Sequence, residues 1–195
     1  ICEIVDGLLN RIMQAAGHGA IPLPIPRMTY AEAMSRFGSD KPDLRFGMEI
    51  TDLSTIFAQS AFKVFAQVVA KGGVVKAINA KKLAGVPIRV VEEWTELAKA
   101  SGMGGMAYIR IQDDGTWKSP ILKFFSESEI ESLRKTLNAE VGDLILFAAD
   151  KAEIVHPFLG KLRLVAGAMA EAIPKDKFSF LWVTEFPLFE LDAEG

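Results

Sequence analysis

Residues 60–175 alternate between short β-rich runs and amphipathic runs with helical spacing, and this alternation limits the possible folds more than any other feature of the chain. The clearest strand signal is the continuous apolar run at residues 143–149, and the clearest helix signal is the apolar stripe over residues 151–172. The predicted strands are residues 63–70, 74–80, 106–111, 117–124 and 143–149, and the predicted helices are residues 87–101, 127–138 and 151–172. This order favours the α+β class, as a two-layer unit with a mainly antiparallel sheet and packed helices.

Turn and cap residues support several of these boundaries. The Lys-Gly-Gly sequence at residues 71–73 separates the first two predicted strands and indicates a hairpin. Pro120 interrupts the fourth predicted strand, which places that strand at an edge of the sheet because proline cannot donate to a ladder. Ser126 and Glu129 have the spacing of a capping box, so a helix is expected to begin directly after Ser126.

The residues on either side of this unit have a different character. Alternate prolines in the run IPLPIPRM require an extended chain that cannot be an interior strand. Thr29 begins a second capping box. Near the other end, residues 178–189 (FSFLWVTEFPLF) are apolar on both faces and predict a buried strand. The helices predicted outside the central unit are residues 2–16, 30–37 and 52–60.

The composition excludes several classes of protein. The chain has 195 residues, is 50% hydrophobic and carries a net charge of −3, which argues against a strongly basic nucleic-acid-binding protein but leaves room for a local basic patch. The single cysteine, Cys2, excludes an internal disulfide framework and suits a reducing compartment. No apolar run approaches the ~20 residues that cross a bilayer. The chain starts without Met and stops just after a strand-like segment, so we expect a piece of a longer protein.

No group of residues has the spacing of a catalytic, cofactor-binding or metal-binding site. His156 has no Ser, Cys or carboxylate partner at a characteristic spacing, so a structural histidine is favoured over a catalytic one. The glycine-rich run at residues 102–106 follows a predicted helix and precedes a strand, whereas phosphate-binding loops lead from a strand into a helix. The residues alone therefore predict no catalytic or metal-binding residue.

Two blocks of sequence nevertheless resemble a known family. Residues 26–47 (PRMTYAEAMSRFGSDKPDLRFG) resemble the segment that follows motif 2 in bacterial-type aspartyl-tRNA synthetases, which are class II enzymes. Residues 180–190 (FLWVTEFPLFE) resemble the segment that re-enters their catalytic domain. The residues between the two blocks are similar to the bacterial insertion domain, called GAD because a subunit of glutamyl-tRNA amidotransferase shares it.

The resemblance implies a division of the chain and a function for its parent protein. Residues 1–50 would be a catalytic-domain piece, residues 51–176 the GAD-like insertion domain, and residues 177–195 the strand that re-enters the catalytic domain. The parent would be a cytoplasmic, homodimeric aspartate–tRNA ligase that uses ATP and Mg²⁺ to activate aspartate and esterify tRNA. Motifs 1, 2 and 3 are missing from this chain, so it is expected to be inactive alone and to hold no cofactor.

Two further questions stay open in the sequence. The chain could instead be a non-catalytic GAD-type module of a tRNA-dependent amidotransferase, although both flanking blocks resemble the synthetase. The sequence also does not say whether the parent charges only tRNA-Asp or also tRNA-Asn.

The charged loop at residues 38–47 (GSDKPDLRFG) is the feature with a possible role in binding. Lys41 or Arg45 would contact the acceptor end of tRNA, since both residue types hold phosphate. The favoured alternative is a structural hinge, in which Asp40 or Asp43 pairs with these cations. Glycines 38 and 47 are expected to supply positive φ angles where the chain changes direction.

Overall fold

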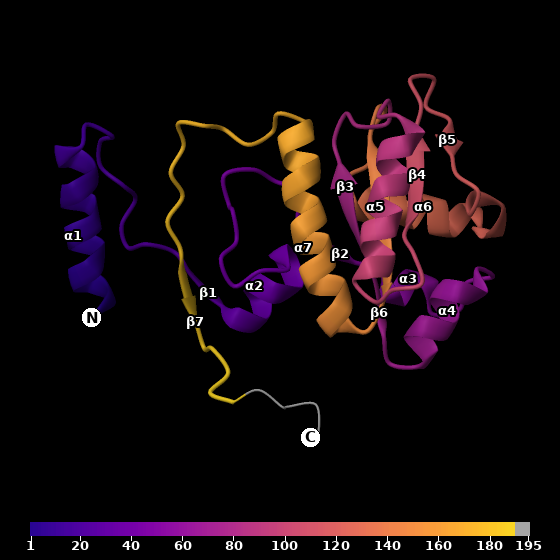
Figure 1. Ribbon diagram of the computed structural model, residues 1–195, viewed down its shortest axis with the longest axis horizontal. Coiled ribbons are helices and arrows are strands. Elements are labelled where there is room, and N and C mark those ends of the chain that lie inside the picture. Colours follow the sequence, from indigo (N-terminus) through magenta and orange to yellow (C-terminus); the bar gives the residue numbers. More distant parts are fainter. Residues whose placement is uncertain (190–195) are drawn as a thin grey trace.

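The computed structural model describes residues 1–189, and a five-stranded antiparallel sheet forms its centre (Figure 1). The strand order is β2-β3-β6-β4-β5, so β2 and β5 are the edges. The longest pairing joins β3 to β6, from Val74 opposite Asp150 to Ala80 opposite Leu144. The strands of the sheet are β2 (Thr51–Asp52), β3 (Val74–Ala80), β4 (Ala107–Ile111), β5 (Trp117–Lys118) and β6 (Leu144–Asp150).

Helices cover both faces of this sheet. On one face, α5 (Ile88–Ala100) and α7 (Ala152–Met169) pack on the strands through Trp94, Leu159 and their neighbours. On the other face lie α3 (Ser54–Phe57), α4 (Lys63–Ala70) and α6 (Glu127–Thr136). The α+β class and the mainly antiparallel sheet are confirmed. The prediction had two layers, whereas the sheet lies between two layers of helices. Almost every residue of the central strands is therefore buried, which explains the continuous apolar runs.

The first predicted hairpin is wrong, because residues 63–70 form helix α4 instead of a strand. β-branched residues favour strands only weakly, and side-chain packing determines that residues 63–70 form a helix. The Phe65 side chain points toward the sheet and packs against the rings of Phe57 and Phe147, while Val64 faces solvent. The glycines at 72 and 73 end this helix, and the Gly73 N–H donates to the Val68 carbonyl.

The predicted strand over residues 117–124 is also much shorter. It stops at Lys118, and a 3₁₀ helix, η1 (Leu122–Phe124), follows Pro120. Its edge position is confirmed by the strand order. The Ser126 capping box is confirmed, whereas the Thr29 box is only half formed. Thr29 accepts from the Glu32 N–H, but the Glu32 carboxylate pairs with Arg36 instead of reaching back.

The flanking residues form α1 (Cys2–Ala15), β1 (Arg27–Thr29), α2 (Tyr30–Phe37) and β7 (Trp182–Thr184). β1 and β7 pair in parallel, with Arg27 opposite Trp182 (Figure 1). The prediction of a buried strand over residues 178–189 is wrong, since only three of them are in a strand and Phe178 and Phe186 are exposed. Within residues 1–189, β7 has a single neighbouring strand, and its residues are only partly buried. In the same residues, every helix is too short or too polar to cross a bilayer.

Candidate functional site

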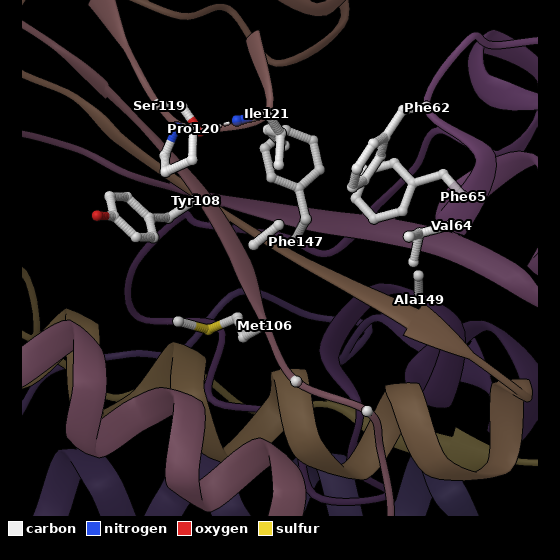
Figure 2. A pocket seen from close by; sticks show the side chains of 13 residues that line it. Phe62, Val64, Phe65, Met106, Tyr108, Ser119, Pro120, Ile121, Phe147 and Ala149 are labelled. Carbon is white, nitrogen blue, oxygen red and sulfur yellow. Dashed lines mark hydrogen bonds between the residues drawn. The ribbon is translucent and has the colours of Figure 1, made fainter. Parts of the chain in front are cut away.

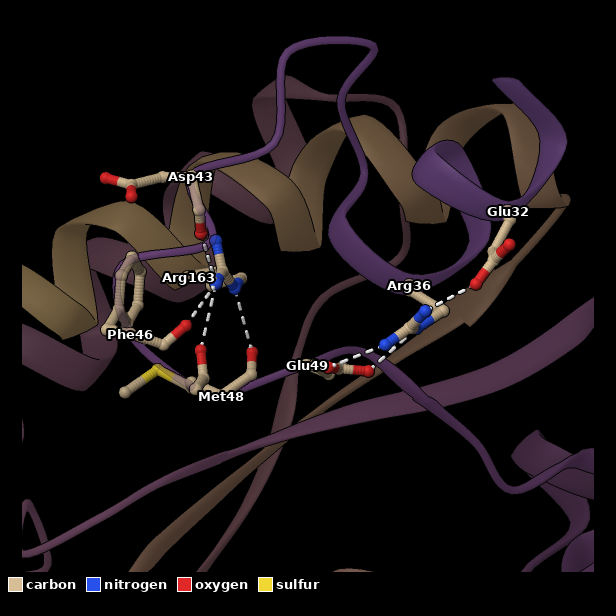
Figure 3. Close-up of polar contacts among 8 residues, drawn as sticks. Glu32, Arg36, Asp43, Phe46, Met48, Glu49 and Arg163 are labelled. Atoms are coloured by element: carbon tan, nitrogen blue, oxygen red, sulfur yellow. Dashed lines mark hydrogen bonds and ion pairs between the residues drawn. The ribbon is translucent and has the colours of Figure 1, made fainter. Parts of the chain in front are cut away.

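The charged loop and its continuation, residues 38–48, fold onto α7 around one arginine (Figure 3). Arg163 has 1% of its surface exposed, and its guanidinium donates to four carbonyl oxygens of the loop. The distances are 3.1 Å to Met48, 2.8 Å to Asp43, and 2.9 Å to each of Phe46 and Gly47. Four acceptors on one planar donor group fix the path of this loop, because each bond constrains a different peptide unit.

Aromatic rings complete the surroundings of this arginine. The guanidinium carbon lies 4.0 Å from the centre of the Phe46 ring and 5.0 Å from that of Phe37. Burial lowers the pKa of Arg163 from its ordinary value, while the Asp43 and Glu49 carboxylates act in the opposite direction. Carbonyl dipoles and ring faces thus replace the water that the cation loses.

Glycines let the loop approach the helix closely. Gly38 has φ 66°, and a Cβ there would lie 2.0 Å from the carbonyl oxygen of His156 on α7. A Cβ on Gly160 of that helix would lie 2.6 Å from the Gly38 oxygen, so neither residue tolerates a side chain. The expectation for Gly38 is confirmed, but Gly47 does not have a positive φ; Met48, with φ 66°, has it instead.

A second arginine fixes the far end of the loop to α2. Arg36 donates to both carboxylate oxygens of Glu49 at 2.8 Å and also pairs with Glu32 (Figure 3). The hydrogen bonds to Glu49 raise the pKa of Arg36 above its ordinary value. The Ile50 N–H donates to the Arg36 carbonyl at 2.8 Å, so backbone and side chain hold the same position. We call this assembly of α2, residues 38–50 and α7 the joint.

The two cations predicted from the sequence occupy different environments. Arg45 makes a two-pronged contact with Asp43, at 2.9 Å from Nε and 2.7 Å from the terminal nitrogen, and it also reaches the Pro174 carbonyl at 3.4 Å. The hydrogen bond from Arg45 lowers the pKa of Asp43. Lys41 instead has 88% of its side chain exposed and lies 3.8 Å from Asp40. The geometry thus suits a structural role for Arg45 and leaves the Lys41 ammonium accessible.

A small polar cluster lies behind the joint, where β3 meets α2 and α7. The Lys76 ammonium is buried, donates to the Ser35 hydroxyl at 2.9 Å and lies 3.7 Å from Asp52. Burial lowers the pKa of Lys76, although Asp52 opposes the shift. Burial and the charge of Lys76 also lower the pKa of His156, whose Nε2 is buried without a hydrogen-bond partner among residues 1–189. Within the same residues no three His, Cys, Asp or Glu side chains gather as metal ligands would.

Sequence reasoning missed Arg163, the centre of the joint, although a signal was present. Arg163 lies four residues after Leu159 and eight after Val155, and so falls on the buried stripe of the helix. A charged residue in that position needs buried partners. Gly160 and Gly167, inside the same helix, indicated that another segment packs closely against it.

Comparison with known proteins identifies the fold of the central unit. Residues 65–159 match the model of the GAD domain family. The chain is 47% identical over 194 residues to the aspartate–tRNA(Asp/Asn) ligase of Geotalea uraniireducens and covers 32% of it. It is 43% identical over 195 residues to the same enzyme of Syntrophotalea carbinolica, and 47% over 196 residues to that of Bacillus cytotoxicus, covering 33% of each. The chain thus spans about a third of the length of these curated relatives. It is similar over its whole length to a segment of bacterial aspartate–tRNA ligases, and the match to the GAD domain family lies within that length.

Proposed function

We propose that this chain is the insertion-domain segment of an aspartate–tRNA ligase. The whole protein would activate aspartate with ATP and Mg²⁺ and transfer it to the 3′ end of tRNA, acting as a cytoplasmic homodimer. The observation that carries this proposal is the identity of 47% over the whole chain, including the residues outside the GAD match at 65–159. A GAD module of an amidotransferase is disfavoured, because the relatives that match these flanks are ligases.

The proposed division of the chain follows from the points where it would leave the catalytic domain and return to it. Residues 1–50 and 177–195 belong to the catalytic domain in this proposal, and residues 51–176 are the inserted GAD domain. The parallel pairing of β1 with β7 supports the division, since the two ends of the insertion lie on neighbouring strands. Residues 190–195 of the third part lie outside the described residues.

The proposed role of the joint is to fix the orientation of the GAD domain on the catalytic domain. Arg163 and Arg36 together hold residues 43–49 against two helices, so the connection between the units has little freedom to bend. Arg45 belongs to this connection through Asp43. Lys41 is the residue that we propose contacts tRNA phosphate, because its side chain is 88% exposed.

A segment exchange tests the proposed activity. Residues 1–195 would replace the matching third of the Geotalea uraniireducens ligase, and aspartate-dependent ATP–pyrophosphate exchange would be measured for the chimera and for the chain alone. We expect exchange by the chimera and none by the chain alone. Charging of tRNA-Asp and of tRNA-Asn by the chimera would be compared with the parent ligase, and we expect both, as the names of the relatives imply. Exchange by the chain alone, or a folded chimera without activity, would contradict the proposal.

A substitution in the same chimera tests the tRNA contact. Lys41→Ala should raise the KM for tRNA several-fold and reduce the salt dependence of binding by about one counterion, as expected for one lost phosphate contact. Lys151→Ala removes another exposed lysine and is the control. Equal effects of the two substitutions would exclude a specific contact at Lys41.

A further inference from the structure

Among the strands of residues 1–189, one part of the central sheet lacks a neighbouring strand at its edge. β5 pairs with β4 only at Arg110 and Ile111, because the chain turns away at Pro120 into η1. In an antiparallel strand, the N–H and C=O groups of successive residues point to alternate sides. The Ile111 N–H donates toward β6 and the Gln112 N–H donates toward the β5 side. Tyr108, four residues before Gln112, therefore directs its backbone N–H and C=O to the side where β5 has ended.

An apolar hollow of about 360 Å³ lies beside this open edge (Figure 2). Phe147 and Ala149 of β6 lie between two walls, one formed by α4 with Phe62 and Phe65, and the other by Pro120 and Ile121. The glycines at 104 and 105 lead into β4, and a Cβ on Gly104 would meet nothing within 4 Å. The approach to the Tyr108 backbone is therefore open, and the hollow beside it suits apolar side chains.

The charged groups next to the hollow are mainly positive. Lys63, the first residue of α4, lies in the sequence between the lining residues Phe62 and Val64. Lys123 lies over the ring of Phe124, which stacks on Phe62. Both lysines are exposed, and neither forms an ion pair with another residue in the part of the chain that the structure describes. The Glu129 carboxylate, near the start of α6, is already bound to Ser126. An acidic occupant would meet complementary charge on this side.

We propose that this surface binds an extended peptide segment of a partner protein, which adds a strand to β4. The peptide backbone would pair with Tyr108, alternate apolar side chains would enter the hollow, and acidic side chains would face Lys63 and Lys123. An unpaired backbone donor and acceptor beside a row of side-chain pockets is the arrangement that strand addition uses. RNA is the less favoured occupant, because bases need exposed ring faces for stacking, whereas Phe65 and Phe147 are both buried and pack against each other.

The test uses the 195-residue chain and a displayed library of random peptides as the probe. We expect the enriched peptides to alternate apolar and acidic residues, and a synthetic copy to protect the Tyr108 amide from hydrogen exchange. Val64→Asp, at the rim of the hollow with 58% of Val64 exposed, should weaken that peptide about tenfold. Val141→Asp, at a residue that is 54% exposed and lies outside the hollow, should leave binding unchanged.

Three results would overturn the proposal. These are a library without enrichment, peptides that protect other amides while Tyr108 exchanges freely, and oligouridine that perturbs the hollow when no selected peptide does. The readout at a single amide does not require that any variant fold. It is also independent of ligase activity, so this proposal and the proposed function can fail separately.

Discussion

The central sheet unit and the flanking elements differ in how much of their apolar surface they bury. The sheet buries two separate apolar clusters, one on each face, and each receives residues from several helices. In the part of the chain that the structure describes, the flanking cluster contains three buried apolar residues, which are Met28, Ala33 and Phe37. Helix α1 instead exposes an apolar stripe formed by Ile4, Leu8 and Ile12, and Ile1 before the helix is exposed as well. The comparison shows that one region satisfies its own apolar surface and the other leaves a surface of the kind that marks an interface.

The joint modifies this contrast, because it attaches α2 to the self-sufficient region. Arg163 is a residue of α7, which packs on the sheet, yet all four of its acceptors belong to the loop after α2. The poorly packed region therefore consists of α1, β1 and β7, and α2 belongs with the well-packed region. Five measurements test the difference in packing between the two regions.

The largest expected difference is in susceptibility to protease. Arg11, Arg27, Lys175 and Lys177 are exposed in the poorly packed region, and we expect trypsin to cut there first and leave a resistant central piece. Cleavage of a native protein follows the free energy of local opening, which is lowest where few apolar contacts hold the chain. Early cleavage at Arg89 or Lys99 of α5 would show that the sheet unit is not the stable part.

A matched pair of phenylalanine substitutions compares the two regions directly. Phe57 is fully buried, with ring centres of Phe65 and Phe125 at 5.0 and 4.9 Å, whereas Phe186 is 50% exposed. Phe57→Ala should lower the free energy of unfolding by about 3–5 kcal/mol. Phe186→Ala should change it by about 0.5 kcal/mol or less. Denaturant titration followed by circular dichroism gives both values, and similar costs would refute the contrast.

Arg163→Met tests whether the joint depends on its buried cation. Four carbonyl oxygens would lose their donor, and we expect a loss of about 2–4 kcal/mol in the free energy of unfolding. Lys161→Met, at an exposed position of the same helix, should cost about 0.5 kcal/mol or less. If both substitutions cost the same, the guanidinium does not hold the loop.

Gly38→Ala tests the close approach of loop and helix. The new Cβ would meet the His156 oxygen, and the left-handed backbone disfavours it as well, so we expect a loss of about 2–3 kcal/mol. Gly72→Ala is the control, because Gly72 has φ 81° but nothing within 4 Å of its added Cβ. That substitution should cost about 1 kcal/mol, from backbone strain alone. The difference between the two variants measures the contact, and no difference would mean that the loop can move away.

The smallest effect is expected from His156. Its pKa in the folded protein is lowered by burial and by Lys76, against the attraction of Asp52 and Glu153. The unfolded chain takes up a proton as the pH falls through about 6.5, while the folded protein does not, so stability decreases from pH 7 downward until the folded pKa is reached. His156→Gln should remove about 1 kcal/mol or less of this pH dependence. His18→Gln, at an exposed position, is the control, and equal pH profiles for the two variants would contradict the prediction.

Sequence reasoning worked where a residue acts on its near neighbours in the chain. Ser126 caps a helix through the residue three positions later, and the helix over residues 30–37 ends at Gly38 as predicted. It failed where distant contacts decide. Phe65 packs on rings from two other segments, Phe57 of α3 and Phe147 of β6, and residues 63–70 form a helix there. Arg163 meets acceptors more than 100 residues away. The tRNA-contact and hinge alternatives for Lys41 and Arg45 remain predictions, and the contact of Arg45 with the Pro174 carbonyl could not be read from the sequence because 129 residues separate the two.

The parallel pairing of β1 with β7 has a consequence for how the chain can be connected. Neighbouring parallel strands lie about 4.8 Å apart and point the same way, so a tight turn cannot join them. Such strands need a crossover of at least a dozen residues, which in most proteins is a single helix. Here everything between Thr29 and Trp182 serves as that crossover. A shorter version of the protein therefore cannot simply close the gap with a turn, and it must keep enough chain to return to the starting edge of the strand pair.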